Sequence, residues 1–150
     1  LYYYASHEES PLEKYVYSID LKGKKKKLTP TKGWNEAEFS KSFKYYINTV
    51  SNADMPPVYT LYAANGKAVR TLEDNAALKT KLEEYPVAKK EFIQIPAADG
   101  TTQLNVWIMK PVNFDESKTY PVLIIQYSGP NSQQVSNTWG MDWTQYLAQE

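Results

Sequence analysis

The stretch YPVLIIQYSGP at residues 120–130 decides which fold is expected for the second half of the chain. Within it, Val122–Ile125 are four consecutive apolar residues between Pro121 and the Gly-Pro turn at Gly129 and Pro130. An unbroken apolar run bounded in this way is typical of a strand buried on both faces, as in a parallel sheet. The sequence therefore predicts a buried parallel strand over Val122–Ile125, followed by a loop.

The segments on either side of this strand favour an α/β arrangement. Upstream, Phe92–Pro96 and Leu104–Met109 flank an Asp99-Gly100 turn, which predicts a β-hairpin. Downstream, Trp139–Leu147 carries large apolar residues at i, i+4 and i+8, which predicts a helix. A hairpin, a buried strand, a loop and a helix in this order are a common beginning of an α/β-hydrolase domain.

Residues 1 to about 74 follow an all-β pattern instead. Turn signals such as Leu21-Lys22-Gly23 and Asn65-Gly66 separate short runs rich in tyrosine and β-branched residues. The runs are Leu1–Ser6, Lys14–Leu21, Ala37–Phe39, Lys44–Ser51 and Val58–Ala64. They predict antiparallel meanders, and their spacing fits propeller blades and a sandwich equally well. Lys24–Lys27 are expected to form a solvated turn that protects a strand edge.

A short helix is expected to connect the two halves. Asp74-Asn75 offers an N-terminal cap, apolar residues recur at helical spacing over Leu78–Tyr85, and Pro86 ends the pattern. At the ends of the chain, Leu1–Tyr4 already has the pattern of a strand, and no stop signal follows the last predicted helix. We therefore expect a segment of a longer polypeptide.

The composition excludes several classes of function. Lys plus Arg and Asp plus Glu number 17 each, so the chain lacks the net basic charge that nucleic-acid or membrane-surface binding needs. The absence of cysteine and a single histidine, His7, argue against disulfides, thiolate sites and a zinc site. No cofactor, no metal and no nucleic-acid partner are therefore expected. No apolar stretch is long enough to span a bilayer, and no signal peptide opens the chain.

The stretch YPVLIIQYSGPNSQ at residues 120–133 closely resembles the first hydrolase strand and following loop of the dipeptidyl peptidase IV family, which are prolyl oligopeptidase-type serine peptidases. The stretch LEDNAAL at residues 72–78 resembles the end of that family's propeller. The resemblance implies that residues 1–74 are the C-terminal part of a β-propeller and residues 75–90 a connector helix and linker. Residues 91–150 would then be the truncated N-terminal part of an α/β-hydrolase domain.

The family's chemistry implies roles for residues in the loop. A serine in a Gly-x-Ser-x-Gly elbow, with Asp and His, attacks the amide after the second residue of a peptide, preferentially after Pro or Ala. Tyr127 occupies the position of a tyrosine whose hydroxyl helps to hold the oxyanion, and loss of such a donor costs about 10²–10³ in turnover. Pro130 and Gln133 match loop positions near the substrate pocket. Trp139 is expected to pack in the core or between domains, and it is also a candidate for lining the substrate entrance.

The resemblance also implies what this segment lacks. The chain contains no Gly-x-Ser-x-Gly, and His7 precedes the hydrolase half, whereas the family's catalytic histidine follows the nucleophile. Glu8-Glu9 is not carried over as the acidic pair that binds the substrate amine, since that pair belongs to an earlier blade. The segment is therefore expected to be inactive by itself and to need the remainder of the same polypeptide.

Other interpretations stay open at this point. The parent could be a related acylaminoacyl peptidase or oligopeptidase, although those relatives usually differ at Tyr127–Pro130. It could also be a non-catalytic homologue that serves as a binding scaffold. A stand-alone β-rich binding module is disfavoured, because a buried hydrolase strand would have no sheet neighbours. The resemblance further implies a peptide substrate, a homodimer, and an exported enzyme that is periplasmic, secreted or membrane-tethered.

Overall fold

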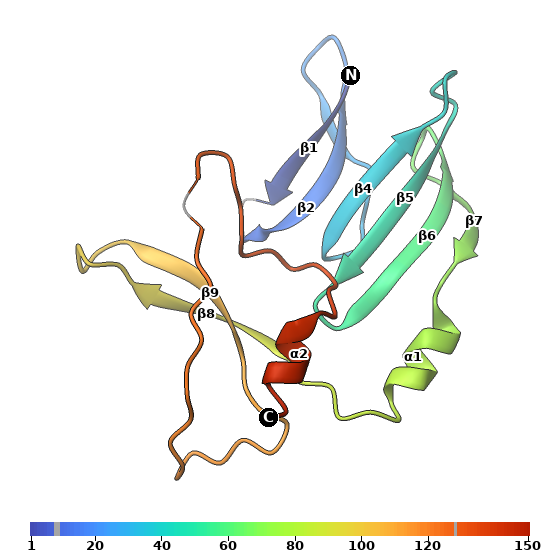
Figure 1. Ribbon diagram of the computed structural model, residues 1–150. Helices are drawn as coiled ribbons and strands as arrows, with labels where there is room; N and C mark the ends of the chain where they lie inside the picture. The colour runs from blue at the N-terminus through green and yellow to red at the C-terminus, as the bar shows by residue number, and fades with distance from the viewer. Residues whose placement is uncertain (8–9, 128) are drawn as a thin grey trace. The chain divides into compact units, whose positions relative to one another are not determined.

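The computed structural model describes residues 1–7, 10–127 and 129–150 (Figure 1). The chain divides into two compact units, of which the first comprises Leu1–Tyr85 with Ser136–Gly140. The second comprises Pro86–Val135 with Met141–Glu150. Most of the regular structure is β-strand, and the helices found in the described part of the chain, of seven and five residues, are too short to cross a membrane.

The first unit is built on a seven-stranded sheet in the order β1-β2-β4-β5-β6-β7, with β3 paired to β2. The strands are β1 (Tyr2–His7), β2 (Ser10–Ile19), β3 (Lys25–Lys27), β4 (Trp34–Phe39), β5 (Tyr45–Asn52), β6 (Met55–Ala63) and β7 (Ala68–Glu73). From β4 to β7 each strand pairs antiparallel with the next, side by side in Figure 1, which confirms the predicted meander. The strands β2 and β4 meet in parallel at one residue pair, Lys14 and Trp34.

A cluster of aromatic rings forms the core of the first unit. Tyr46 on β5 is buried together with Val16 and Leu28. The Tyr46 ring stacks on that of Tyr62, with 5.2 Å between centroids, and its centroid lies 5.1 Å from that of Phe39. The Tyr46 hydroxyl donates a hydrogen bond to the Leu28 carbonyl oxygen at 3.2 Å. Tyrosine suits these strands because its ring packs in the core while its hydroxyl still finds a partner.

The environment of Tyr46 predicts sensitivity to alkaline pH. Burial, and then the neighbouring Tyr62 and Tyr2, raise the pKa of Tyr46 from 10.0 to about 12. Since the folded pKa lies above the unfolded value, the stability this group contributes is complete below pH 10 and is lost as the pH rises through about 12. We expect the tyrosinate absorbance of the folded protein to include one late-titrating group that Tyr46→Phe removes. An unchanged titration curve in the variant would contradict this assignment.

Two strands of the first unit differ from the sequence expectation. Lys25–Lys27 form the edge strand β3 instead of a turn, and the turn itself lies earlier, at Leu21 and Lys22. The Lys26 ammonium donates to the Asn65 carbonyl oxygen, and that of Lys27 lies 3.3 Å from the centre of the Tyr15 ring, so both side chains are tied to the sheet. Strand β7 was not predicted, because its residues are all exposed and show no alternation of buried and polar positions.

Helix α1 (Ala76–Leu82) lies where the connector helix was expected, but its predicted cap was partly wrong. Asn75 has a left-handed backbone, with φ of 54°, and its side chain makes no capping hydrogen bond. Its Nδ2 instead donates to the Pro57 carbonyl oxygen at 2.7 Å. The carboxylate of Asp74 accepts the N–H of Ala76 at 2.9 Å. Asn75 therefore ties the start of the helix to β6, and Asp74 satisfies a free N–H.

The second unit contains the predicted hairpin. Strands β8 (Lys90–Pro96) and β9 (Gln103–Met109) pair antiparallel along their full length. In the turn between them, the Asp99 carboxylate accepts three hydrogen bonds. They come from the hydroxyl of Thr102, the N–H of Thr102 and the N–H of Thr101. These bonds lower the pKa of Asp99 to about 2. The turn is thus held by its own side chains, as its sequence predicted.

The predicted strand over Val122–Ile125 is not formed in this structure. These residues have no regular secondary structure, and Val122 and Ile124 are 82% and 81% exposed. The strands described in this unit, β8 and β9, pair with each other, so the run has no sheet to enter. The predicted α/β layer is accordingly not present in the chain as described.

The helix expected over Trp139–Leu147 is shorter than predicted. Helix α2 (Trp143–Leu147) begins only after Asp142, whose carboxylate accepts the N–H of Thr144 at 2.9 Å and caps the helix. Trp139 lies outside it, in a segment that belongs to the first unit. Gln145 ties α2 to the chain before β8, because its amide both accepts from the N–H of Ala88 and donates to the Ala88 carbonyl oxygen.

Candidate functional site

The loop over residues 127–135 carries the three candidate residues, Tyr127, Pro130 and Gln133, and all three are exposed. Ser128 lies outside the described residues. The N–H of Ser132 donates to the Gly129 carbonyl oxygen at 3.2 Å and closes a four-residue turn. Pro130 occupies its second position and Asn131, with φ of 58°, its third, as in a type II turn. This gives Asn131 a structural role, because asparagine tolerates a positive φ better than most residues.

Tyr127 lies against Gly129 in this loop. A Cβ built on Gly129 would stand 2.5 Å from Cε1 and 2.6 Å from the hydroxyl oxygen of Tyr127. The space taken by the Tyr127 ring therefore favours glycine at this position. Tyr127 is 64% exposed. Its hydroxyl can therefore donate a hydrogen bond to a molecule that approaches from solvent.

The glutamines of the loop form hydrogen bonds within it. The Nε2 of Gln133 donates to the Val135 carbonyl oxygen at 2.9 Å. The Nε2 of Gln134 donates to the Ser132 hydroxyl at 2.7 Å. Gln133 thus lies on the same loop as Tyr127, with an amide N–H engaged by the loop itself.

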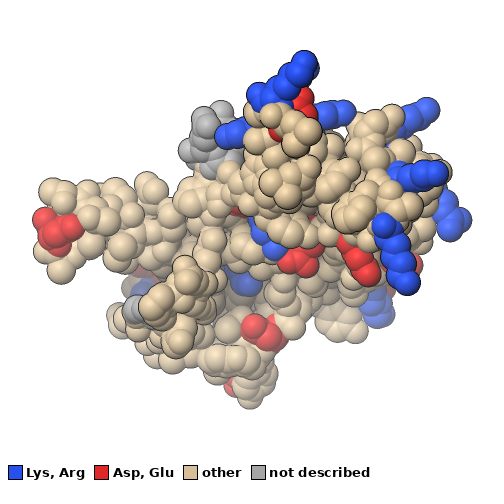
Figure 2. Space-filling view, turned by 90° about the horizontal axis from the view of Figure 1, so that it is seen from above, with Lys and Arg blue, Asp and Glu red and all other residues tan. Residues whose placement is uncertain are grey.

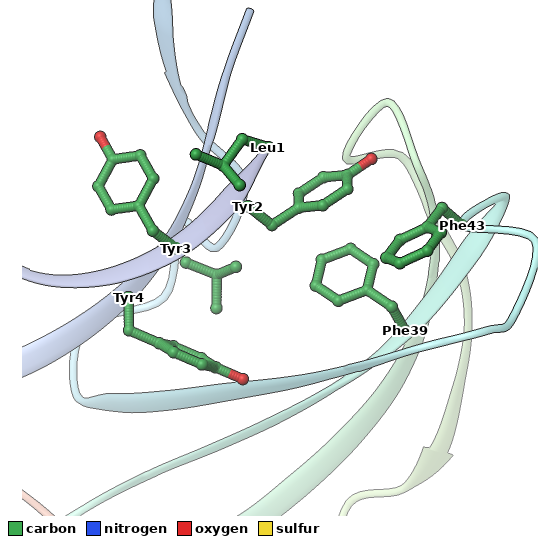
Figure 3. Close-up of a pocket in the computed structure, with 7 residues that line it drawn as sticks. Leu1, Tyr2, Tyr3, Tyr4, Phe39 and Phe43 are labelled. Carbon is green, nitrogen blue, oxygen red and sulfur yellow. The ribbon is translucent and has the colours of Figure 1, made fainter.

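A separate apolar cavity of about 530 Å³ lies in the first unit (Figure 3). Its walls are Leu1, Tyr2, Tyr3, Tyr4, Val16, Phe39 and Phe43. Figure 3 shows the rings of Tyr2, Phe39 and Phe43 together on one side, and the Tyr2 ring stacks on that of Phe43 with 5.9 Å between centroids. None of the candidate loop residues lines it, and its lining includes no carboxylate, imidazole or amine side chain. The cavity therefore offers packing surface and not acid–base chemistry.

Charged side chains do not mark a second site. The face seen in Figure 2 carries Lys and Arg side chains close to Asp and Glu. Within residues 1–7, 10–127 and 129–150, no group of three or more potential ligands that could hold a metal ion was found. Glu8 and Glu9, which the sequence did not favour as an amine-binding pair, lie outside the described residues.

Sequence reasoning missed two features of this region. The first is the contact between Gly129 and the Tyr127 ring, which the spacing of the two residues alone could not reveal. The second is the segment Ser136–Gly140, which was assigned to a loop and a helix but belongs to the first unit. The local signal for its bonds to another part of the chain is its run of polar residues, Ser136, Asn137 and Thr138.

Comparison with known proteins relates the chain to dipeptidyl peptidases. The family model described as "Dipeptidyl peptidase IV (DPP IV) N-terminal region" matches residues 1–57. A probable dipeptidyl peptidase 4 of Emericella nidulans is 34% identical over 157 aligned residues, which cover 100% of this chain and 20% of the relative. The dipeptidyl peptidase 4 of Trichophyton rubrum is also 34% identical, with the same coverage. The chain thus spans about a fifth of the length of the curated relatives it matches.

Two solved structures extend the similarity to the fold. The crystal structure of Porphyromonas gingivalis dipeptidyl peptidase 4 matches with a TM-score of 0.89 and 49% identity, over 98% of this chain and 21% of that one. A putative dipeptidyl aminopeptidase IV from Bacteroides ovatus matches with a TM-score of 0.76 and 30% identity, over 91% of this chain and 20% of that one. These relatives are named as dipeptidyl peptidases or as a dipeptidyl aminopeptidase. The chain belongs to the dipeptidyl peptidase IV family.

Proposed function

We propose that this chain is part of a serine exopeptidase that releases N-terminal dipeptides, preferentially after Pro or Ala. The observation that carries the proposal is the structural similarity to a solved bacterial dipeptidyl peptidase over nearly the whole chain. The exposed hydroxyl of Tyr127, on a loop closed by its own turn, supports it. The serine nucleophile, its Asp and its His would come from the remainder of the same polypeptide.

In this proposal the Tyr127 hydroxyl donates a hydrogen bond to the oxyanion of the tetrahedral intermediate. A phenol suits this task because it offers one directed hydrogen bond where negative charge develops. The N–H next to the serine would supply the second donor. Pro130 and Gln133 would border the substrate pocket, Pro130 as apolar surface at the turn and Gln133 as a polar side chain of the same loop.

We also propose the domain assignment that the family implies. Residues 1–74 would be the last strands of a β-propeller, residues 75–90 the connector, and residues 91–150 the first part of an α/β-hydrolase domain. The exposed run Val122–Ile125 supports this, because four neighbouring apolar side chains in water favour burial elsewhere. They would become a strand once the remainder of the polypeptide supplies the sheet. On the same resemblance we propose a homodimer and an exported enzyme that is periplasmic, secreted or membrane-tethered.

The test of the proposed function compares two substrates of the full-length protein. A chromogenic Gly-Pro dipeptide with a free amine should be cleaved, and its N-acetylated counterpart should not, because a dipeptidyl peptidase binds the free N-terminus. Preferential cleavage of the acetylated substrate would indicate an acylaminoacyl peptidase instead. A well-folded protein that cleaves neither would be a non-catalytic homologue or an enzyme of another specificity.

Gly129→Ala is expected to lower kcat of the full-length enzyme by about tenfold or more, because the new Cβ takes the space of the Tyr127 ring and displaces its hydroxyl. The change should leave stability within about 0.5 kcal/mol, since the ring is exposed and free to rotate away. Steady-state kinetics and a thermal melt measure both quantities. Asn131→Gly, in the same turn, is the control and should keep its kcat. Full activity of Gly129→Ala would show that the ring position seen here is unimportant.

A further inference from the structure

The segment Ser136–Gly140, which follows the Tyr127 loop, is bonded to the sheet of the first unit. The N–H of Asn137 donates to the Leu12 carbonyl oxygen at 2.7 Å. The side-chain oxygen Oδ1 of Asn137 accepts the N–H of Ala53 at 2.9 Å. One residue thus bonds to two places in the first unit: β2, and the turn between β5 and β6.

Ser51 at the end of β5 holds the two following residues. Its hydroxyl oxygen accepts the N–H of Trp139 at 3.3 Å and lies 3.3 Å from the hydroxyl oxygen of Thr138. The pairing of β5 with β6 shifts register between Val50 and Asn52, so Ser51 stands at an irregularity of the hairpin. Ser51 is buried, and these contacts occupy its side chain. We call Asn137, Thr138 and Trp139 the clasp.

The clasp stands at the C-terminal end of the loop that carries Tyr127. The chain leaves the second unit at Val135, is held by the first unit over Ser136–Gly140, and returns to the second unit at Met141. The C-terminal end of the loop is therefore followed by residues bonded to strands far from it in the sequence, as the pair Ser51 and Thr138 shows, which lie 87 positions apart. Such a tether reduces the number of conformations the loop can adopt.

We infer that Asn137 is a positioning residue for the peptidase reaction: it fixes the end of the Tyr127 loop to the β5–β6 turn and so holds the Tyr127 hydroxyl where the oxyanion forms. The inference rests on the proposed function. Asn137 itself does not touch substrate in this account. Asn137 affects the reaction through Tyr127. The Tyr127 hydroxyl stabilises the oxyanion less well when its loop samples other positions.

The experiment uses variants of the full-length protein on the Gly-Pro substrate. Asn137→Ala removes the acceptor for the Ala53 N–H, whereas Asn137→Asp keeps an oxygen there. Asn65→Ala is the matched control, because Asn65 Oδ1 accepts the N–H of Lys67 at 3.0 Å in another hairpin turn. We expect Asn137→Ala to lower kcat by about tenfold with KM changed less than about twofold, as for an interaction made only in the transition state. Asn137→Asp should restore most of the activity, and Asn65→Ala should match the wild type.

Two further measurements separate positioning from mere stabilisation. Hydrogen exchange of the Ala53 amide should accelerate in Asn137→Ala, which shows that the clasp bond has been lost. In a Tyr127→Phe background, Asn137→Ala should cause little further loss of kcat, because the donor to be positioned is already absent. Faster exchange with unchanged kcat overturns the inference, and so does an equal loss in both backgrounds. Full kcat in the Tyr127→Phe variant overturns the proposed oxyanion role itself. This single variant is measured before the double variant, so the two failures are distinguished.

Discussion

Replacing Tyr127 by phenylalanine is expected to lower kcat of the full-length protein on the Gly-Pro substrate by about 10²–10³. The change removes one oxygen and its proton and keeps the ring that lies against Gly129. If the hydroxyl donates to the oxyanion only as charge develops, kcat and kcat/KM should fall together while KM changes little. Steady-state kinetics over a range of substrate concentrations measure these constants.

The folded state should hardly respond to the same change. Tyr127 is 64% exposed, so the loss of its hydroxyl removes little packing. Tyr146→Phe is the matched control, because Tyr146 is 63% exposed and lies on α2, outside the candidate loop. It should keep both its kcat and its melting temperature. Equal kcat values for Tyr127→Phe, Tyr146→Phe and the wild type would remove Tyr127 from the chemistry and leave the family assignment intact.

The largest effect on stability is expected from Gly33→Ala. Gly33 has φ of 132°, a region that residues with a side chain rarely adopt, and a Cβ there would stand 2.2 Å from the Ser51 carbonyl oxygen. The clash is with backbone, so a strand must move. Gly33 also precedes Trp34, where β2 and β4 meet, and its carbonyl oxygen accepts the N–H of Lys14 at 3.1 Å. We expect a loss of about 3 kcal/mol or more in the free energy of unfolding.

Gly23→Ala separates the two causes of this loss. Gly23 also has a positive φ, of 83°, but nothing lies within 4 Å of a Cβ built there. Alanine at Gly23 should therefore cost only the backbone strain, about 1 kcal/mol. Urea unfolding followed by the fluorescence of the tryptophans measures both variants. Equal losses would mean that strain alone acts at Gly33 and that the packing of Gly33 against Ser51 contributes nothing.

The features that sequence predicted correctly are those with local causes. The hairpin of β8 and β9 was predicted because Asp99 and Gly100 favour a tight turn whatever surrounds them, and the structure shows the Asp99 carboxylate closing that turn. The tyrosine-rich strands were predicted because their side chains suit a half-buried sheet, and Tyr46 and Tyr62 stack in this way. In the hairpin turn the signal and its cause lie within a few residues of each other, and in the strands the signal is a property of the tyrosine side chain itself.

The features that were missed depend on distant partners. Val122–Ile125 were predicted as a strand from their apolar side chains, but a strand needs a neighbour for its backbone, and β8 and β9 pair only with each other here. Trp139 fits helical spacing with Trp143, yet the Asp142 cap starts the helix after it and Ser51 binds its N–H. The periodicity of the sequence shows neither that Val122–Ile125 have no neighbouring strand nor that Trp139 bonds to Ser51.

The candidate site was predicted by family resemblance and not by local pattern. An exposed tyrosine after an apolar run has no chemical signature of its own, and only the surrounding motif singled out Tyr127, Pro130 and Gln133. Their roles remain proposals that the experiments above test. The structure adds two residues that the motif alone did not single out, Gly129 beneath the tyrosine ring and Asn137 in the clasp.

Whether the full-length protein is a dipeptidyl peptidase is decided by the mass of the first product that it releases from a peptide of natural length with proline at its second position. Incubation with that peptide and mass spectrometry of the early products are sufficient. We expect a two-residue product made of the N-terminal residue and proline, with a remaining peptide shortened by those two residues. Release of a single residue, internal cleavage, or an intact peptide after incubation with folded protein would contradict it.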